Sequence, residues 1–189
     1  MIKVVFVGDT QVGKTCIISR LTSGSFKSTN PATIGAAFQT HVMTTPQGTV
    51  TMQIWDTAGQ EKYRALAPMY YRSADVAVLC FDVTNQASYE AMEQWSNELA
   101  EKAPQRMQLI ICGNKIDDID HRVISKDAGE QHAMRHGAKA YIETSAKTGE
   151  GIVELFTKAA ELASDADIAS TKPKTKKLEE NEEKPKGCC

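Results

Sequence analysis

The segment from Gly8 to Thr15, which reads GDTQVGKT, most constrains what this chain can fold into. It matches the pattern G-x-x-x-x-G-K-[ST], in which backbone N–H groups and a lysine surround a phosphate chain. The β-branched run Ile2–Val7 precedes it and predicts a buried strand, and a helical stretch follows at Cys16. A glycine loop between strand and helix directs N–H groups and the positive helix end toward an anion. We therefore expect this loop to bind the phosphates of a nucleoside triphosphate.

Lys14 and Thr15 have separate roles in this prediction. The Lys14 ammonium would reach the β- and γ-phosphates, and the Thr15 hydroxyl would coordinate Mg²⁺. The alternative is an ordinary strand-to-helix turn that needs glycine for its backbone angles. The pattern fixes four positions and lies between a predicted strand and a predicted helix, which favours phosphate binding.

Composition and charge favour one intracellular domain. The chain has 189 residues, of which 41% are hydrophobic, enough for one sizeable core. Its net charge of −2 predicts no general attraction to nucleic acid. We expect no membrane-spanning segment and no signal peptide, because the apolar runs are too short. Cys16, Cys80 and Cys112 lie in apolar or helical stretches and are expected to be buried, reduced thiols.

Strands and helices alternate along the chain to about residue 163. After Ile2–Val7, the predicted strands are 37–44, 50–55, 76–81, 107–112 and 139–143, and the predicted helices include 87–102 and 152–162. This order predicts a doubly wound α/β domain, and the glycine loop after its first strand adds the P-loop NTPase type. Its mostly parallel six-stranded sheet would carry helices on both faces and bind ligands at the carboxyl ends of the strands.

The composition changes after Ala163. Residues 164–187 are rich in Lys, Glu, Pro and Thr, and their large apolar residues are Ile168 and Leu178. Such a segment cannot bury enough surface to offset its ordering entropy, so residues 164–189 are predicted to be a disordered tail. Its acidic block offsets its basic block, which makes the tail a weak electrostatic anchor at best.

Three further segments follow predicted strands and would share the edge of the sheet with the phosphate loop. They are Asp56–Gln60, Asn114–Asp117 and Ser145–Lys147. Asp56 would lie near the metal and Gly59 near the γ-phosphate. The Asp117 carboxylate can accept hydrogen bonds from both N1–H and the exocyclic amine of guanine, a donor pair that adenine lacks. The sequence therefore predicts a guanine nucleotide.

Together these segments resemble the small GTPases of the Ras superfamily over residues 2–163. Within that superfamily the chain is similar to the Rab GTPases, through residues 34–38, 55–66 and 70–74 and the closing pair Cys188-Cys189. Residues 33–38 and 66–71 are most similar to the early-endosomal branch of Rabs. The resemblance implies a GTPase domain over residues 1–163 that hydrolyses GTP to GDP with Mg²⁺. It also implies a switch in vesicle trafficking, whose switch segments are about 27–38 and 59–71.

The resemblance implies roles for individual residues. Thr33 would bind Mg²⁺ together with Thr15, and Asp56 would hold the metal through water. Gln60 would orient the attacking water, which makes Gln60 and Lys14 the expected catalytic residues. The residues implied to contact GTP or GDP are Thr10, Gln11, Val12, Gly13, Lys14, Thr15, Cys16, Phe26, Thr33, Gly59, Asn114, Lys115, Asp117, Ser145, Ala146 and Lys147.

Within that set, the base has its own contacts. Phe26 and the aliphatic stem of Lys115 would sandwich the guanine. Asn114, Ser145 and the N–H of Ala146 would fix the surrounding loop and the base carbonyl. These roles are carried over from the family, position by position.

The same resemblance extends to partners. Phe38, Trp55 and Tyr70 resemble the aromatic triad that Rabs present to effectors, with ordinary packing as the alternative. Cys188 and Cys189 resemble the Rab signal for double geranylgeranylation, and two lipid chains give stable membrane anchoring where one does not. An exchange factor, a GTPase-activating protein, a GDP-dissociation inhibitor and the Rab escort protein are the implied regulators. The implied location is the cytoplasmic face of endomembranes, early endosomes and endocytic vesicles above all, with a cytosolic pool.

Gln11 departs from the family, which usually has a small residue at this position beside the γ-phosphate. Two alternatives therefore stay open. In a pseudo-GTPase, Gln11 would obstruct the attacking water, so that nucleotide would bind without being hydrolysed. A general P-loop ATPase or kinase would prefer ATP, against the guanine contact predicted for Asp117.

Overall fold

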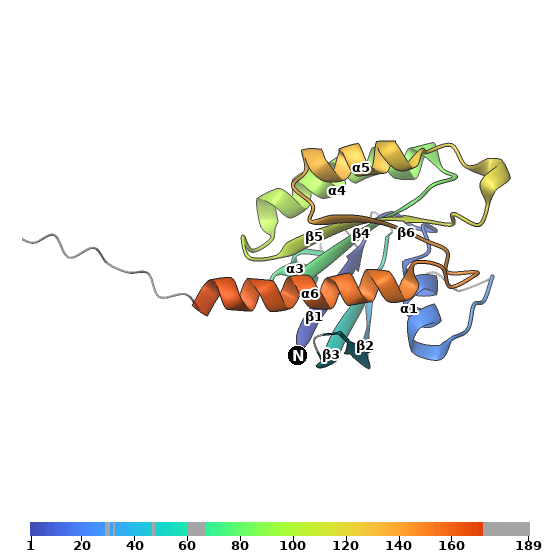
Figure 1. Cartoon of the computed structure of the whole chain (residues 1–189). Helices are drawn as coiled ribbons and strands as arrows, with labels where there is room; N and C mark the ends of the chain where they lie inside the picture. The colour runs from blue at the N-terminus through green and yellow to red at the C-terminus, as the bar shows by residue number, and fades with distance from the viewer. Residues whose placement is uncertain (29–30, 32, 47, 60–66, 172–189) are drawn as a thin grey trace, which may run out of the picture.

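A six-stranded sheet forms the centre of the molecule in a computed structural model that describes residues 1–28, 31, 33–46, 48–59 and 67–171 (Figure 1). The strands are β1 (Ile2–Val7), β2 (Ala36–Thr45), β3 (Gly48–Thr57), β4 (Val76–Asp82), β5 (Gln108–Asn114) and β6 (Ala140–Thr144). The helices are α1 (Lys14–Ser23), α3 (Ala67–Tyr71), α4 (Gln86–Lys102), α5 (Lys126–Arg135) and α6 (Ile152–Thr171), with the 3-10 helix η1 at Ile119–His121.

The strand order is β2-β3-β1-β4-β5-β6. β2 pairs antiparallel with β3, and every other neighbouring pair is parallel. β4 is buried at every residue, as expected of a central parallel strand that helices cover on both sides. The predicted α/β fold with a mostly parallel sheet is confirmed.

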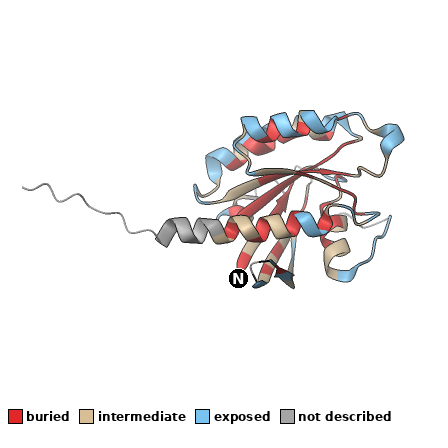
Figure 2. Cartoon of the chain, viewed as in Figure 1, coloured by how far each residue is buried: buried red, intermediate tan, exposed pale blue. Residues whose placement is uncertain are grey.

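The core lies in two layers, one on each face of the sheet. On one face, Ile17 and Ile18 of α1 and Phe156 of α6 pack against alternate residues of the strands. On the other face, Met92 of α4 and Ala133 of α5 pack against the intervening residues. The helices accordingly turn buried residues inward and exposed residues outward (Figure 2). Because helices cover both faces of the sheet, a ligand binds at the carboxyl ends of the parallel strands.

Two helices differ from the prediction. α5 had no predicted counterpart, because its buried residues are Gly129, His132 and Ala133, which leave no large apolar stripe in the sequence. Ser125 nevertheless caps it by accepting a hydrogen bond from the Ala128 N–H. α6 begins at Ile152 as predicted but continues beyond residue 163, where the tail was expected to begin, to residue 171. The remainder of that tail, with Cys188 and Cys189, lies outside the described residues.

The thiols agree with the prediction in part. Cys80 and Cys112 are buried and lie opposite each other on β4 and β5, whereas Cys16 is half-buried; these three cysteines of the described residues are reduced. In the described part of the chain, no helix has the combination of length and apolar character needed to span a bilayer.

Candidate functional site

A cleft of ≈ 900 Å³ is lined by residues that follow β1, β3, β5 and β6. The predicted nucleotide-binding residues on its wall are Thr10, Gln11, Gly13, Lys14, Thr15, Cys16, Phe26, Thr33, Gly59, Asn114, Lys115, Asp117, Ala146 and Lys147. Val12 and Ser145 are buried behind that wall. Gln60 lies outside the described residues. Residues far apart in sequence are thus brought to one cleft, as the strand order requires.

The N-terminus of α1 is open toward this cleft. Its cap residue, Gly13, has a φ of 97° and contributes no side-chain hydrogen bond, and the first helical turn contains no acidic residue. The first N–H groups of a helix have no intrahelical partner, and the helix dipole favours negative charge there. A Cβ at position 13 would overlap the side-chain nitrogen of Asn114, so the close packing as well as the backbone angle requires glycine.

The Lys14 ammonium is buried at the base of the phosphate loop. Its Nζ donates hydrogen bonds to the carbonyls of Gly8 at 2.6 Å and Asp9 at 2.7 Å, and the residue is 6% exposed. Desolvation lowers the pKa of Lys14, and the nearby Asp56 and Asp9 oppose that shift. An ammonium has three N–H donors, so one remains for a phosphate oxygen.

Three side-chain oxygens meet beside Lys14. The Thr15 hydroxyl donates to Asp56 Oδ2 at 2.6 Å, and the Thr33 hydroxyl lies 3.1 Å from Thr15 Oγ1 and 3.4 Å from the same Asp56 oxygen. Hydroxyl and carboxylate oxygens are the ligands that Mg²⁺ prefers. The predicted metal-binding residues are therefore adjacent, although the sequence separates them by up to 41 positions.

Asp56 has an unsatisfied oxygen. Its Oδ1 is buried and has no hydrogen-bond partner among the described residues. Burial raises the pKa of Asp56, although the hydrogen bond from Thr15 and the charge of Lys14 act in the opposite direction. A buried carboxylate oxygen without a partner is costly unless a cation or a bound water satisfies it. These residues therefore fit a magnesium ion, held directly or through water.

The chain leaving β3 lies directly against the phosphate loop. A Cβ at Gly59 would overlap the backbone of Asp9 and Thr10, which only a glycine avoids. The preceding Ala58 N–H donates to the carbonyl of Gly35 at 2.8 Å. The first predicted switch segment is therefore joined to the residue that directly precedes the second, and the second begins at Gly59 against the phosphate loop.

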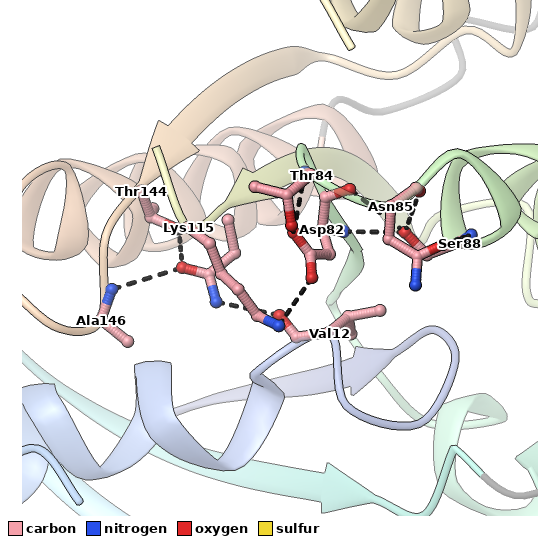
Figure 3. Close-up of polar contacts among 9 residues, drawn as sticks. Val12, Asp82, Thr84, Asn85, Ser88, Lys115, Thr144 and Ala146 are labelled. Atoms are coloured by element: carbon pink, nitrogen blue, oxygen red, sulfur yellow. Dashed lines mark hydrogen bonds and ion pairs between the residues drawn. The ribbon is translucent and has the colours of Figure 1, made fainter. Parts of the chain in front are cut away.

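Asn114 joins the opposite ends of the cleft. Its buried amide nitrogen donates to the carbonyl of Val12 at 2.9 Å, and its amide oxygen accepts from Thr144 Oγ1 at 3.1 Å and from the Ala146 N–H at 3.3 Å (Figure 3). One side chain thus holds the phosphate loop, β6 and the segment after β6 in fixed relative positions.

The Asp117 carboxylate is oriented by two residues of that last segment. Ser145 Oγ donates to Asp117 Oδ1 at 2.6 Å, and Lys147 Nζ lies 3.6 Å from Oδ2. The Ser145 oxygen accepts in turn from the Thr148 N–H at 3.0 Å. A carboxylate has about four acceptor sites, so both oxygens keep capacity for a ligand.

Lys115 is held in place by a residue that sequence analysis did not identify. Its Nζ lies 2.6 Å from Asp82 Oδ2, and Thr84 donates to the other Asp82 oxygen through its N–H and its hydroxyl (Figure 3). Lys115 has a φ of 71°, so the backbone turns sharply at this point. Its stem and Phe26, which is 36% exposed, both line the cleft.

Arg20 is a second residue that the sequence did not reveal. From α1, its guanidinium donates to the carbonyls of Ala146 at 2.7 Å and Gly24 at 2.8 Å, and also to that of Lys147. Arg20 therefore fixes the loop after β6 to α1. Ser28, Pro31, Thr57 and Asp118 also line the cleft without having been predicted.

Gln11 has a left-handed backbone. Its φ is 64°, and its side chain is exposed on the wall of the cleft. This conformation places a non-glycine Cβ near the following carbonyl, at a cost of roughly 1–2 kcal/mol. The Gln11 side chain is therefore open to solvent at the edge of the phosphate loop.

Three aromatic rings meet beside the predicted switches. The ring centroids of Phe38 and Trp55 are 5.3 Å apart, and those of Trp55 and Tyr70 are 5.7 Å apart. They come from β2, β3 and α3, and Phe38 is 48% exposed. The structure therefore brings the predicted triad together at the surface.

Comparison with known proteins identifies relatives over the same span. The model of the Ras family matches residues 3–165. The chain is 41% identical over 154 residues to Ras-related protein RABF2b of Arabidopsis thaliana, covering 82% of this chain and 76% of that protein. It is 41% identical over 157 residues to GTP-binding protein ypt5 of Schizosaccharomyces pombe, covering 82% and 74%. Ras-related protein Rab-15 of Mus musculus is 36% identical over 196 residues, covering 99% and 92%.

Proposed function

This chain belongs to the Ras family and, within it, to the Rab GTPases, and on that premise we propose how its residues act as a guanine-nucleotide switch. As a member of that family it binds GTP and GDP and hydrolyses GTP. Its similarity to Rab5-type proteins such as RABF2b and ypt5 supports a role in endocytic trafficking.

The phosphates bind at the open end of α1. Residues 10–16 supply backbone N–H groups, and Lys14 contributes a buried positive charge close to the γ-phosphate. Phosphoryl transfer needs positioning and charge stabilisation more than covalent catalysis from the protein. Gln60, which directly follows Gly59 in the sequence, orients the attacking water.

The oxygen cluster would hold Mg²⁺. Thr15, Thr33 and Asp56 are the protein residues that would bind it, and the unpartnered Asp56 Oδ1 supports this assignment. When bound, the metal neutralises charge on the phosphates. Thr33 also belongs to the first switch segment. Whether GTP or GDP is bound therefore determines whether that segment stays in its effector-binding form.

Guanine is selected by Asp117. Its carboxylate, oriented by Ser145 and Lys147, accepts hydrogen bonds from the N1–H and the exocyclic amine. Phe26 and the Lys115 stem cover the two faces of the base. Adenine offers no equivalent pair of donors.

The aromatic triad, with Phe38 exposed and Trp55 and Tyr70 half-buried, is the effector contact. Phe38 belongs to the first switch segment and Tyr70 to the second, with Trp55 between them, and aromatic anchors dominate many protein interfaces. The tail after the G domain carries prenyl groups on Cys188 and Cys189. These anchor the protein on the cytoplasmic face of endosomal membranes, and an exchange factor, an activating protein, a GDP-dissociation inhibitor and the Rab escort protein act on it.

A single observation carries this proposal: Lys14, Thr15 and Asp117 line one cleft. The test is displacement of a fluorescent GTP analogue from the Mg²⁺-loaded protein by GTP, GDP or ATP, followed by single-turnover hydrolysis of GTP. We expect GTP and GDP to displace the analogue and ATP to fail.

Each result has one interpretation. Displacement by ATP at similar concentrations would refute guanine selection. Tight GTP binding without any hydrolysis, with or without an activating protein, would instead identify a pseudo-GTPase, and Gln11→Ala would then be the first variant to examine.

A further inference from the structure

Two histidines and a glutamate meet on the side of the molecule where α4 and α5 cover the sheet (Figure 1). Glu93 comes from α4, His132 from α5 and His136 from the residue that ends α5. His132 and His136 are four positions apart, a spacing that puts two side chains on the same side of a helix. None of the three lines the nucleotide cleft.

The donor atoms of the three residues converge. One atom from each lies within 4.8 Å of the other two. Glu93 Oε2 is 3.1 Å from His136 Nε2 and 4.0 Å from His132 Nδ1. Metal bonds of about 2.0–2.2 Å in a tetrahedral arrangement put neighbouring ligand atoms roughly 3.3–3.6 Å apart. The observed distances lie on either side of that range, so a small side-chain adjustment suffices.

His132 is already oriented as a ligand. Its Nε2 lies 3.0 Å from Ser96 Oγ, and its side chain is 2% exposed. Metal-bound histidines commonly hydrogen-bond through the ring nitrogen that does not touch the metal, which fixes the ring. In His132 the contact with Ser96 occupies Nε2, so Nδ1 is the ring nitrogen on the side of Glu93 and His136.

An ion pair alone does not account for this arrangement. His136 and Glu93 form one at 3.1 Å, but His132 Nδ1 is 4.0 Å from the same carboxylate, too far for a hydrogen bond. Burial, with the neighbouring His136, lowers the pKa of His132 to about 4, so this imidazole is neutral at pH 7. A neutral imidazole is the form that binds metals.

We propose that Glu93, His132 and His136 form a binding site for one divalent transition-metal ion, with zinc as the best match. Two imidazoles and one carboxylate suit Zn²⁺, whereas Mg²⁺ and Ca²⁺ prefer oxygen ligands throughout. Glu93 is 52% exposed, so water reaches the fourth coordination position. The ion would tie α4 to α5, which the hydrogen bond from Tyr89 to the Ala128 carbonyl already joins.

The test uses full-length, tag-free protein loaded with GDP and Mg²⁺ and carrying Cys188→Ser and Cys189→Ser, which remove the terminal thiols as competing ligands. Calorimetric titration with ZnCl₂ should give one site per chain. Glu93→Ala and His136→Ala change partly exposed side chains, and each should weaken binding at least about 10-fold. His121→Ala, at an exposed histidine paired with Asp118, is the matched control and should bind as the parent does.

Ring-nitrogen NMR gives a second measurement that does not depend on a folded variant. The chain has four histidines. Addition of ZnCl₂ should shift the ring nitrogens of His132 and His136 and leave those of His41 and His121 unchanged. Zinc binding that is unaffected by Glu93→Ala and His136→Ala, no binding at all, or equal shifts at all four histidines would each overturn the proposal. None of these results bears on nucleotide binding.

Discussion

The side-chain nitrogen of Asn114 donates a 2.9 Å hydrogen bond to the carbonyl of Val12, and this contact connects β5 to the phosphate loop. The two residues are 102 positions apart in the sequence. Because a Cβ at Gly13 would overlap that nitrogen, the glycine and the asparagine depend on each other. The phosphate loop and the end of β5 are therefore mechanically coupled in this cleft.

Replacing Asn114 by Ala should weaken nucleotide binding and the fold together. The change leaves the Val12 carbonyl and the Ala146 N–H without their hydrogen bonds to Asn114, at about 1–3 kcal/mol for the buried carbonyl. Asn85→Ala is the control, because Asn85 caps α4 by accepting from the Ser88 N–H. It should lower the free energy of unfolding by about 1 kcal/mol and leave GDP affinity unchanged. Equal GDP affinity in both variants would contradict the coupling.

Replacing Asp117 by Asn should alter base preference. The change exchanges an acceptor for a donor opposite the guanine N1–H, so affinity for GTP should fall and affinity for xanthosine triphosphate should rise. Both affinities are measured by competition of GTP and xanthosine triphosphate against a fluorescent GTP analogue. Asp120→Asn, at an exposed position of η1, should change neither affinity. Undiminished GTP binding by the Asp117→Asn protein would refute the assigned base contact.

The parts of this fold that could be predicted from the sequence are those encoded locally. The phosphate loop is a glycine pattern between a strand and a helix, and β4 is an unbroken apolar run. Motifs that follow strands had to meet at one edge of a parallel sheet, so the cleft was predictable from the strand assignments. Asp117 and Thr15 were located in this way.

Contacts that depend on tertiary packing could not be predicted. Asp82 and Arg20 carry no motif, yet they hold Lys115 and the loop after β6. Trp95 lies in the predicted helix 87–102, and its Nε1 donates to Asp9 Oδ1 in the phosphate loop at 2.9 Å, a contact that helix prediction does not give. The Glu93–His132 proximity was equally invisible, because α5 itself lacks an apolar stripe.

Gln60→Leu should slow GTP hydrolysis and leave nucleotide affinity nearly intact, because only water positioning is lost. We expect a decrease of roughly 10-fold or more in single-turnover rate. Gln86→Leu, at an exposed residue of α4, should hydrolyse at the parent rate. Thr15→Asn should behave differently from both, with weaker Mg²⁺-dependent GTP binding and a preference for GDP. A parent-like rate in Gln60→Leu means that another group positions the water.

Removing Cys188 and Cys189 should release the protein from membranes without changing GTP affinity. Fractionation of cells that express the tagged chain measures the release. The single variant Cys188→Ser is the informative intermediate, since one lipid chain gives only marginal, reversible binding. It should lie between the parent and the double variant. A double variant that still pellets with membranes would place the anchor elsewhere.

Gln11 allows backbone strain to be separated from side-chain obstruction. Gln11 has a φ of 64°, a conformation that strains any residue with a Cβ. Gln11→Gly removes both the Cβ and the side-chain amide, whereas Gln11→Ala removes only the amide. Gln11→Gly should therefore raise the free energy of unfolding by up to about 1 kcal/mol over Gln11→Ala, measured on the GDP-bound protein. If the side chain also slows hydrolysis, intrinsic and activator-stimulated rates should rise equally in both variants. Rates that stay at the parent value would make Gln11 a solvated wall residue without effect on catalysis.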